Sequence, residues 1–166
     1  MPTKRSMLLN IFEKRFIPFL IQNDFGQYPL PKWSETHGMK LAFPFGLMKR
    51  KKGKMVEMIK IQLDRRGAPK FVINFGVIPP EGVTIRGKHF SQNDCRVAEA
   101  LVFCRLYPSR WLGPYGWFSP SFFSFAFNIE SKIENMVEDA IKLYPEIENW
   151  FKSKVVGPHV RCNERL

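Results

Sequence analysis

Two stretches decide the fold of this chain: residues 55–63 read MVEMIKIQL, and residues 71–77 read FVINFGV. In both stretches large apolar side chains alternate with the others, which is the two-residue period of a β-strand. The residues between them, Asp64-Arg65-Arg66-Gly67, are typical of a turn. The two stretches therefore predict adjacent antiparallel strands of a meander.

Further strands are predicted on both sides of this pair. Residues 41–47 alternate in the same way, and Pro44 places them at a sheet edge or a bulge, because proline cannot donate to a β-ladder. Residues 97–106 predict a fourth strand, and the Phe-rich residues 122–127 are a candidate fifth. The connecting segments 24–38, 79–93 and 108–120 are rich in Gly and Pro and are predicted to be loops.

Helical patterns stand at both ends of the chain. Apolar residues recur at helical spacing over residues 6–21, where Pro18 predicts a kink or a restart. A second helix is predicted over residues 128–144, and Pro145 is expected to end it and to begin another, over residues 145–153.

These elements predict an α+β domain: an antiparallel sheet of four to five strands, with an N-terminal helix and C-terminal helices packed on one face. We expect residues 1–153 to form this single domain and residues 154–166 to be a loose C-terminal tail. The order of elements lacks an alternating βαβ pattern, and no Gly-rich nucleotide-binding motif is present. A doubly wound nucleotide-binding fold is therefore not predicted.

The composition excludes several classes of protein. A chain of 166 residues with 45% hydrophobic and 14% aromatic residues is long and apolar enough for one packed domain, and too apolar for a disordered chain. The apolar residues are too dispersed for a membrane span of about 20 residues. Charged residues 13–15 interrupt the first apolar stretch, which is unlike a secretory signal, so we expect a cytoplasmic protein.

The cysteines and histidines predict neither a disulfide framework nor a metal site. Cys95, Cys104 and Cys162 are odd in number and carry no CxxC spacing, so reduced thiols are expected. His159 and Cys162 form a short His-x-x-Cys pair without a second pair to complete a tetrahedral site. We expect no metal and no cofactor.

Positive charge is concentrated in the first half of the chain. The net charge is +11, and residues 1–70 hold 15 Lys and Arg against 5 Asp and Glu. The densest run is predicted to be a hairpin turn, and it contains Lys49, Arg50, Lys51, Lys52 and Lys54. Such a turn either binds phosphate groups or, as charge runs more often do, keeps neighbouring strands solvated.

Polar residues inside the apolar runs are the first site candidates. Gln62 and Asn74 are expected on the strand faces opposite the large aliphatic side chains, where they either orient a ligand or form a cross-strand amide pair. Arg105 interrupts an apolar strand and either binds an anion or pairs with Glu99 or a C-terminal carboxylate.

Arg110, Trp111 and Trp117 follow Arg105 in a Gly- and Pro-rich loop. Aromatic residues beside arginine are enriched at protein interfaces, although tryptophans also commonly close a core. This loop is accordingly a candidate partner-binding surface of the kind that an immunity-type interaction domain uses, with core packing as the alternative.

Catalytic motifs are weak, and no catalytic residue is predicted. The serines lack a G-x-S-x-G context, and the carboxylates of residues 128–144 fall on the exposed side of a helix. The sequence therefore favours a non-catalytic binding module whose basic surface takes an anionic partner, either nucleic acid or an acidic protein. The alternatives are an enzyme acting on a small phosphate- or carboxylate-bearing substrate and an immunity-type domain.

The central strands also resemble a known family. Gln62 followed by the 71–77 pattern F-x-x-N-x-G-V, with Asp24-Phe25-Gly26 before it and Cys104-Arg105 after it, resembles the bacterial family catalogued as domain of unknown function 4304. The resemblance covers about residues 7–152. It implies a small cytoplasmic bacterial domain in which Gln62, Asn74 and Arg105 are positions of interest, and it implies no particular chemistry.

Overall fold

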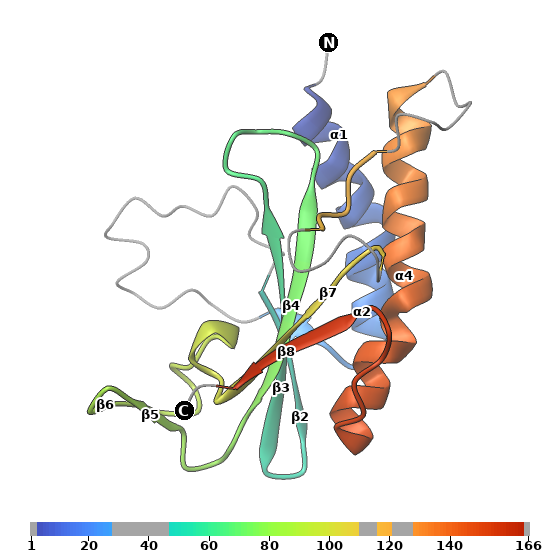
Figure 1. Ribbon diagram of the computed structural model, residues 1–166. Helices are drawn as coiled ribbons and strands as arrows, with labels where there is room; N and C mark the ends of the chain where they lie inside the picture. Colours follow the sequence, from blue (N-terminus) through green and yellow to red (C-terminus); the bar gives the residue numbers. More distant parts are fainter. Residues whose placement is uncertain (1–2, 28–46, 110–115, 121–127, 165–166) are drawn as a thin grey trace.

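The computed structural model describes residues 3–27, 47–109, 116–120 and 128–164. Within these ranges a six-stranded antiparallel sheet runs in the order β1-β2-β3-β4-β7-β8 (Figure 1). Its strands are β1 (Gly26–Gln27), β2 (Leu47–Lys52), β3 (Met55–Leu63), β4 (Phe71–Ile78), β7 (Val102–Leu106) and β8 (Val160–Glu164). The predicted α+β class with an antiparallel sheet is confirmed, and the sheet has more strands than predicted.

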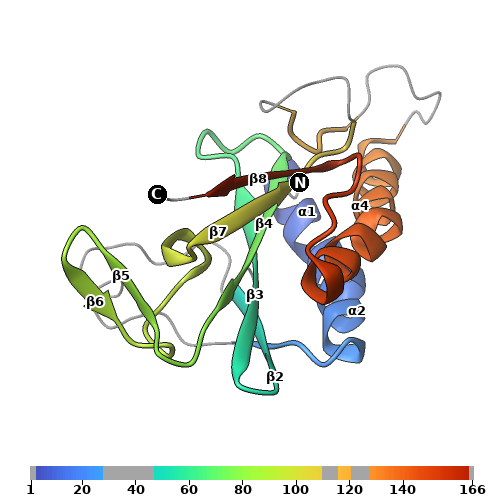
Figure 2. The same cartoon turned by 60° about the horizontal axis from the view of Figure 1, so that its bottom comes forward.

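Helices cover one face of this sheet (Figures 1 and 2). They are α1 (Lys4–Ile11), the π-helical segment η1 (Phe12–Phe16), α2 (Ile17–Gln22) and α4 (Ile129–Ser153). The main core lies between the two layers, where the Trp150 indole meets the Phe75 ring edge-on at a centroid distance of 5.4 Å. The helices therefore lie on one face, as predicted.

Strands β3 and β4 form the predicted antiparallel pair, and β2 pairs with β3 but shares only Leu47 with the strand predicted over residues 41–47. In the register between β3 and β4, Ile59 lies opposite Phe75 and Lys60 lies opposite Asn74. Ile59 and Phe75 belong to the core under the helices. Because side chains alternate along a strand, Lys60 and Asn74 point to the opposite face of the sheet.

The face of the sheet turned away from the helices carries a second, smaller core. Strands β5 (Val83–Ile85) and β6 (Lys88–Phe90) form a hairpin on this side (Figures 1 and 2). The short 3₁₀ helix η3 (Val97–Glu99) packs there too. The predicted loop over residues 79–93 thus contains a hairpin.

The strand predicted over residues 97–106 is shorter than expected. Residues 97–99 form η3, and the extended chain begins only at Val102. The Glu99 carboxylate accepts a hydrogen bond from the Arg96 backbone N–H at 2.8 Å, which closes the first turn of η3. This local cap competes with strand pairing and explains the later start of β7.

Two prolines lie within the helical regions, Pro18 and Pro145, and the sequence predicts the effect of the first but not of the second. The predicted interruption at Pro18 takes the form of the π-helical residues 12–16 just before it, where a wider turn accommodates the proline ring. Pro145 does not divide the C-terminal region into two helices, so that prediction is wrong. The α4 side chains on both sides of it, including Tyr144 and Ile147, are buried against the core, and this packing offsets the missing hydrogen bond.

The segment predicted to be a loose tail forms the edge strand β8. Cys162 lies opposite Cys104 in the register with β7, and the two are joined by a disulfide, which corrects the expectation of reduced thiols. His159 Nδ1 lies 2.5 Å from Glu146 Oε1 and ties the start of this segment to α4. Residues 41–46 of the strand predicted over residues 41–47, and the candidate strand over residues 122–127, lie outside the described residues.

Candidate anion-binding site

Three predicted site residues meet on the sheet face turned away from the helices. Gln62 comes from β3, Asn74 from β4 and Arg105 from β7. Asn74 lies opposite Lys60 on one side and opposite Arg105 on the other. We call Lys60, Gln62, Asn74 and Arg105 the sheet-face cluster.

Hydrogen bonds fix the orientation of the three predicted side chains. Arg105 Nε donates to Asn74 Oδ1 at 2.7 Å, and Asn74 Nδ2 donates to Gln62 Oε1 at 3.1 Å. Arg105 Nη2 reaches the same Gln62 oxygen at 3.5 Å. The cross-strand amide pair considered from the sequence is therefore present, and Arg105 is part of it.

This bonding pattern leaves hydrogen-bond donors as the free groups of the cluster. Both amide oxygens accept bonds from within the cluster, so the Gln62 amide N–H groups and the Nη1 group of Arg105 remain without a protein acceptor among the described residues. Guanidinium and ammonium groups have no acceptor atoms of their own. The cluster is therefore suited to bind an anion.

Lys60 completes the cluster and was missed by sequence reasoning. Its pKa is lowered, first by burial and then by the nearby charges of Arg96 and Arg65, whereas Glu99 acts in the opposite direction. Within the part of the chain that the structure describes, no carboxylate lies within ion-pair distance of its Nζ. A lysine in a strand gives no sequence signal for this environment, since lysines are usually exposed.

A carboxylate near the cluster is bound elsewhere. Glu99 is 7% exposed and pairs with Arg96, whose Nε donates to Glu99 Oε2 at 3.0 Å and whose Nη2 contacts Oε1. The predicted alternative of an Arg105–Glu99 pair is therefore wrong. Because Arg96 already neutralises Glu99, that carboxylate does not neutralise Lys60 or Arg105 by direct pairing.

The sheet-face cluster opens into a small cavity of about 110 Å³. Its floor comes from β3, β4 and β7 and its wall from η3, and its lining residues are Lys60, Gln62, Asn74, Val97, Ala98, Phe103 and Arg105. Gly76 allows this wall to approach the sheet, because a Cβ at that position would lie 2.9 Å from the Ala100 Cβ and 3.1 Å from the Val102 carbonyl oxygen. The glycine of the F-x-x-N-x-G-V pattern thus helps to form the cavity.

The basic run at residues 49–54 is mostly strand, which corrects the predicted turn. β2 continues to Lys52, and the turn consists of Gly53 and Lys54, with Gly53 at φ +60°. Lys51, Lys52 and Lys54 are exposed, and Lys49 is half-buried. None of the five cations predicted in this run lines the cavity.

Arg50 is a second correction, because it is buried under the helices and is not a surface cation. Its side chain is 7% exposed; Nε donates to Glu57 at 2.5 Å, and Nη2 lies 2.7 Å from Glu148 Oε1. Nη1 donates to the Asn23 carbonyl at 2.9 Å, and the guanidinium lies 4.5 Å from the Phe25 ring centroid. Burial alone would lower the Arg50 pKa, but the two carboxylates outweigh it and raise that pKa. Arg50 is therefore a structural residue.

The predicted arginine- and tryptophan-rich loop is only partly described. Arg110 and Trp111 lie outside the described residues. Trp117 is half-buried and does not line the cavity at the sheet-face cluster. The structure thus brings Gln62, Asn74 and Arg105 together and leaves Trp117 apart from them.

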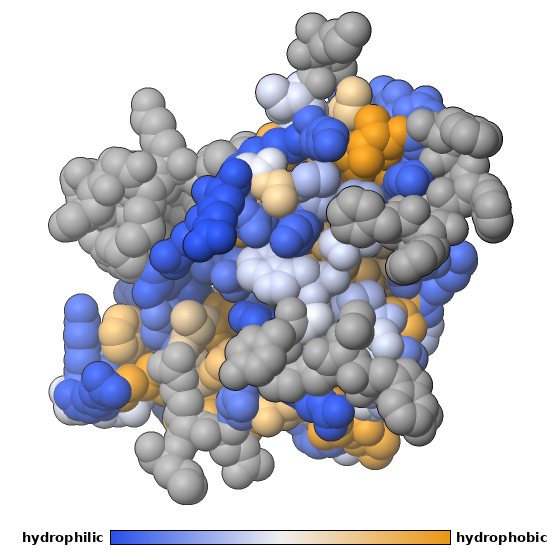
Figure 3. Space-filling view, turned by 45° about the horizontal axis from the view of Figure 1, so that its top comes forward, coloured by the Kyte–Doolittle hydropathy of each residue, from blue (hydrophilic) through white to orange (hydrophobic). Residues whose placement is uncertain are grey.

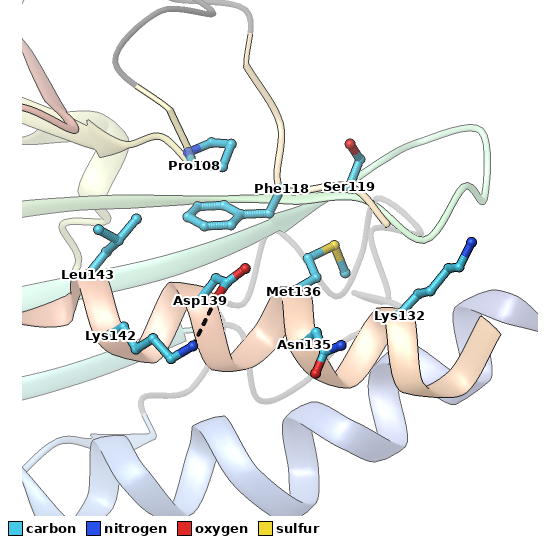
Figure 4. A pocket seen from close by; sticks show the side chains of 9 residues that line it. All are labelled: Pro108, Phe118, Ser119, Lys132, Asn135, Met136, Asp139, Lys142 and Leu143. Atoms are coloured by element: carbon cyan, nitrogen blue, oxygen red, sulfur yellow. Dashed lines mark hydrogen bonds and ion pairs between the residues drawn. The ribbon is translucent and has the colours of Figure 1, made fainter. Parts of the chain in front are cut away.

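A larger cavity of about 290 Å³ lies along α4 (Figure 4). It is lined by Pro108, Phe118, Ser119, Lys132, Asn135, Met136, Asp139, Lys142 and Leu143. Its charged groups include an ion pair, in which Lys142 Nζ lies 3.2 Å from Asp139 Oδ1. Among the described residues the Ser119 hydroxyl donates no hydrogen bond to a lysine, histidine or carboxylate side chain, so no activated nucleophile is present there. We assign no chemistry to this cavity.

Comparisons with protein-family models, with curated proteins and with solved structures find no match. The resemblance of the central strands to the domain of unknown function 4304 family therefore stays a prediction. No described helix is long and apolar enough to cross a membrane. The described residues also contain no group of three or more His, Cys, Asp or Glu side chains that could hold a metal ion.

Proposed function

We propose that this protein is a non-catalytic binding module whose sheet-face cluster binds a nucleic acid through phosphate groups. The observation that carries the proposal is that the free polar groups of the cluster are donors, two of them on cationic side chains, while its oxygens are already bonded within the protein. Phosphate oxygens are acceptors, and arginine and lysine are their common partners in protein–nucleic acid complexes.

A like-charge pair on the same sheet supports this proposal. Arg161 of β8 lies directly opposite Arg105 of β7, and Arg161 is exposed. Like charges directly opposite each other on neighbouring strands destabilise a sheet. A bound phosphate backbone would relieve this repulsion, and the two positive charges would in turn stabilise the bound phosphates. The pair therefore favours a polyanionic ligand.

The distribution of apolar side chains favours nucleic acid over an acidic protein. The exposed large apolar residues of the described chain are Ile21, Met55, Leu101, Val155 and Val156, and none lines the cavity. In the view of Figure 3, hydrophilic side chains form a band across the surface and hydrophobic ones gather in separate patches. Protein interfaces usually need an apolar centre, whereas nucleic-acid interfaces are polar and positively charged.

The lining of the cavity also bears on the enzyme alternative. Among the described residues that line it there is no carboxylate, histidine, hydroxyl or thiol side chain, and the oxygens of the two lining amides are bonded within the cluster. Of the described lining residues, Lys60 is the one ionisable group besides arginine that could act as a general base or nucleophile. The cavity therefore supports binding more strongly than catalysis.

Salt-dependent binding tests the proposed function. We expect fluorescently labelled single-stranded DNA and RNA of 12 nucleotides to bind at about 50 mM salt and to lose affinity steeply by about 200 mM, because each phosphate contact contributes about −0.7 to the slope of log K against log salt. Arg161→Gln should make that slope less negative by about 0.7, the contribution of one phosphate contact. Lys14→Gln, which removes one exposed charge from η1 on the helix side, should leave the slope unchanged.

The same assay includes an acidic peptide as a third probe. Binding of an oligoglutamate peptide without binding of either nucleic acid would show that the anionic partner is an acidic protein. Absence of binding to all three probes at low salt contradicts the proposed function.

A further inference from the structure

We infer that the cavity at the sheet-face cluster recognises a phosphomonoester, as at the phosphorylated end of a nucleic acid, in preference to an internal phosphodiester. This inference rests on the proposed function and names the group that the cavity selects. It follows from three features of the cavity: its charge, its size and the position of its wall.

The charge of the cavity matches a dianion. Lys60 and Arg105 supply two cations, and Gln62 supplies further N–H donors. Glu99, the carboxylate whose charge acts on Lys60, is paired with Arg96. A phosphomonoester carries a charge of about −1.5 to −2 at pH 7, whereas an internal phosphodiester carries one negative charge. The second charge of the monoester would therefore balance the second cation.

The size of the cavity fits a single phosphate group. Its volume of about 110 Å³ is well below the roughly 300–1,000 Å³ of pockets that enclose drug-sized ligands. That space accommodates one tetrahedral oxyanion but not a nucleoside with it. The ligand would therefore place its phosphate in the cavity and leave the rest of the molecule outside.

The wall formed by η3 favours the end of a chain. Val97 and Ala98 stand beside the floor made by β3, β4 and β7, and the contact between Gly76 and Ala100 holds this segment against the sheet. A phosphodiester inside a continuous strand must leave the cavity in two directions, and one of them meets this wall. A terminal phosphate leaves in one direction only.

Matched oligonucleotides test the inference. Two labelled 12-nucleotide strands of one sequence, one with a 5′-phosphate and one with a 5′-hydroxyl, are compared at the same salt concentration, and a 3′-phosphorylated strand covers the other end. We expect at least one phosphorylated strand to bind about tenfold more tightly than the hydroxyl strand. Lys60→Gln should abolish this difference, and Lys14→Gln should preserve it; a melting curve checks that both variants are folded.

The pH dependence gives a second readout. The advantage of the phosphorylated strand should grow from pH 5 to pH 7.5, because a phosphomonoester loses its second proton near pH 6 and a phosphodiester has no such step. The charged groups around Lys60 are Arg96 at the start of η3, Glu99 at its end, Arg65 in the β3–β4 turn and Arg105 on β7. The histidines of the described chain, His89 and His159, do not line the cavity.

Each outcome separates this inference from the proposed function. Equal, salt-dependent binding of the phosphorylated and hydroxyl strands overturns the inference and leaves the proposed function in place. Absence of nucleic-acid binding, with a nucleoside monophosphate or inorganic phosphate bound in a Lys60-dependent manner, supports phosphomonoester recognition and contradicts the nucleic-acid source. If no phosphate-bearing probe binds, both proposals are wrong.

Discussion

Lys60 shows a conflict between stability and binding at the scale of a single residue. Its ammonium group is half-buried and lies near Arg96 and Arg65, which lowers its pKa. A charge in such surroundings opposes folding, because the unfolded chain solvates it better. The same charge is available to an anion, so Lys60 benefits the protein only when a ligand is bound.

Replacing Lys60 should therefore stabilise the free protein. We expect Lys60→Met to raise the free energy of unfolding by about 1 kcal/mol and the melting temperature by about 2–4 °C, since it keeps the aliphatic contacts and removes the charge. Differential scanning calorimetry measures this change. A lower melting temperature for Lys60→Met would show that the ammonium group is stabilised by the fold.

The effect of Lys60→Met should depend on pH. The native pKa of Lys60 lies below the ordinary value of 10.5, so the unfolded state binds the proton more tightly and rising pH favours the native state over that interval. The stability advantage of Lys60→Met should therefore shrink as the pH approaches 10.5. Urea unfolding of both proteins at pH 7 and pH 10 gives this difference directly, and a constant difference would contradict the assigned cause.

Arg50 and Lys51 are neighbours in sequence with opposite environments. Arg50 lies between Glu57 and Glu148 under the helices, whereas Lys51 is exposed on the other face of β2. We expect Arg50→Ala to lower the free energy of unfolding by about 3–5 kcal/mol, because it leaves two carboxylates without their partner. Lys51→Ala should change it by less than about 0.5 kcal/mol. Similar effects of the two substitutions in urea unfolding would contradict the buried ion pairs.

At the scale of elements, β8 depends on contacts that are distant in sequence. It is a five-residue edge strand, and the disulfide between Cys104 and Cys162 spans a sequence separation of 58 residues. Short edge strands pair weakly by themselves, and a cross-link over a long loop restricts mainly the unfolded chain. The disulfide therefore helps to hold β8, and with it Arg161, beside β7.

Removing this cross-link should weaken the fold and loosen β8. We expect Cys104→Ala with Cys162→Ala to lower the free energy of unfolding by about 2–4 kcal/mol under oxidising conditions. Amide hydrogen exchange should accelerate most in residues 160–164. Dithiothreitol should lower the melting temperature of the unmodified protein and leave that of the double variant unchanged; equal responses would show that the bond contributes nothing.

At the scale of the whole molecule, local patterns in the sequence predicted the layers and part of the site. The alternation in residues 55–63 and 71–77 placed Gln62 and Asn74 on the face away from the aliphatic core, and the structure joins both to Arg105. This prediction succeeded because strand alternation is set by neighbouring residues. It needed no knowledge of the other elements.

The remaining features depend on contacts between distant segments. The environment of Lys60 requires η3 to pack over the sheet, and the burial of Arg50 requires α4 to bring Glu148 to β2. Strand β8 forms only by pairing with β7, which is distant in the sequence. Without that pairing, the polar residues of β8 resemble a loose tail. Periodicity and composition carry no information on such pairings, which explains why Lys60 was missed and why the predictions for Arg50 and for the C-terminal residues were wrong.

The order in which the sheet-face cluster can be assembled follows from its chain connectivity. The Gln62–Asn74 bond joins residues 12 apart, whereas the Arg105–Asn74 bond joins residues 31 apart and needs β7 to close a long loop. Loop closure costs more entropy and takes more time as the separation grows, so the β3–β4 hairpin can form without β7. A chain with that hairpin alone has Lys60 and the amide pair but lacks the Arg105 guanidinium and the wall that η3 forms. Anion binding would therefore report on completion of the sheet during refolding, rather than on formation of its first hairpin.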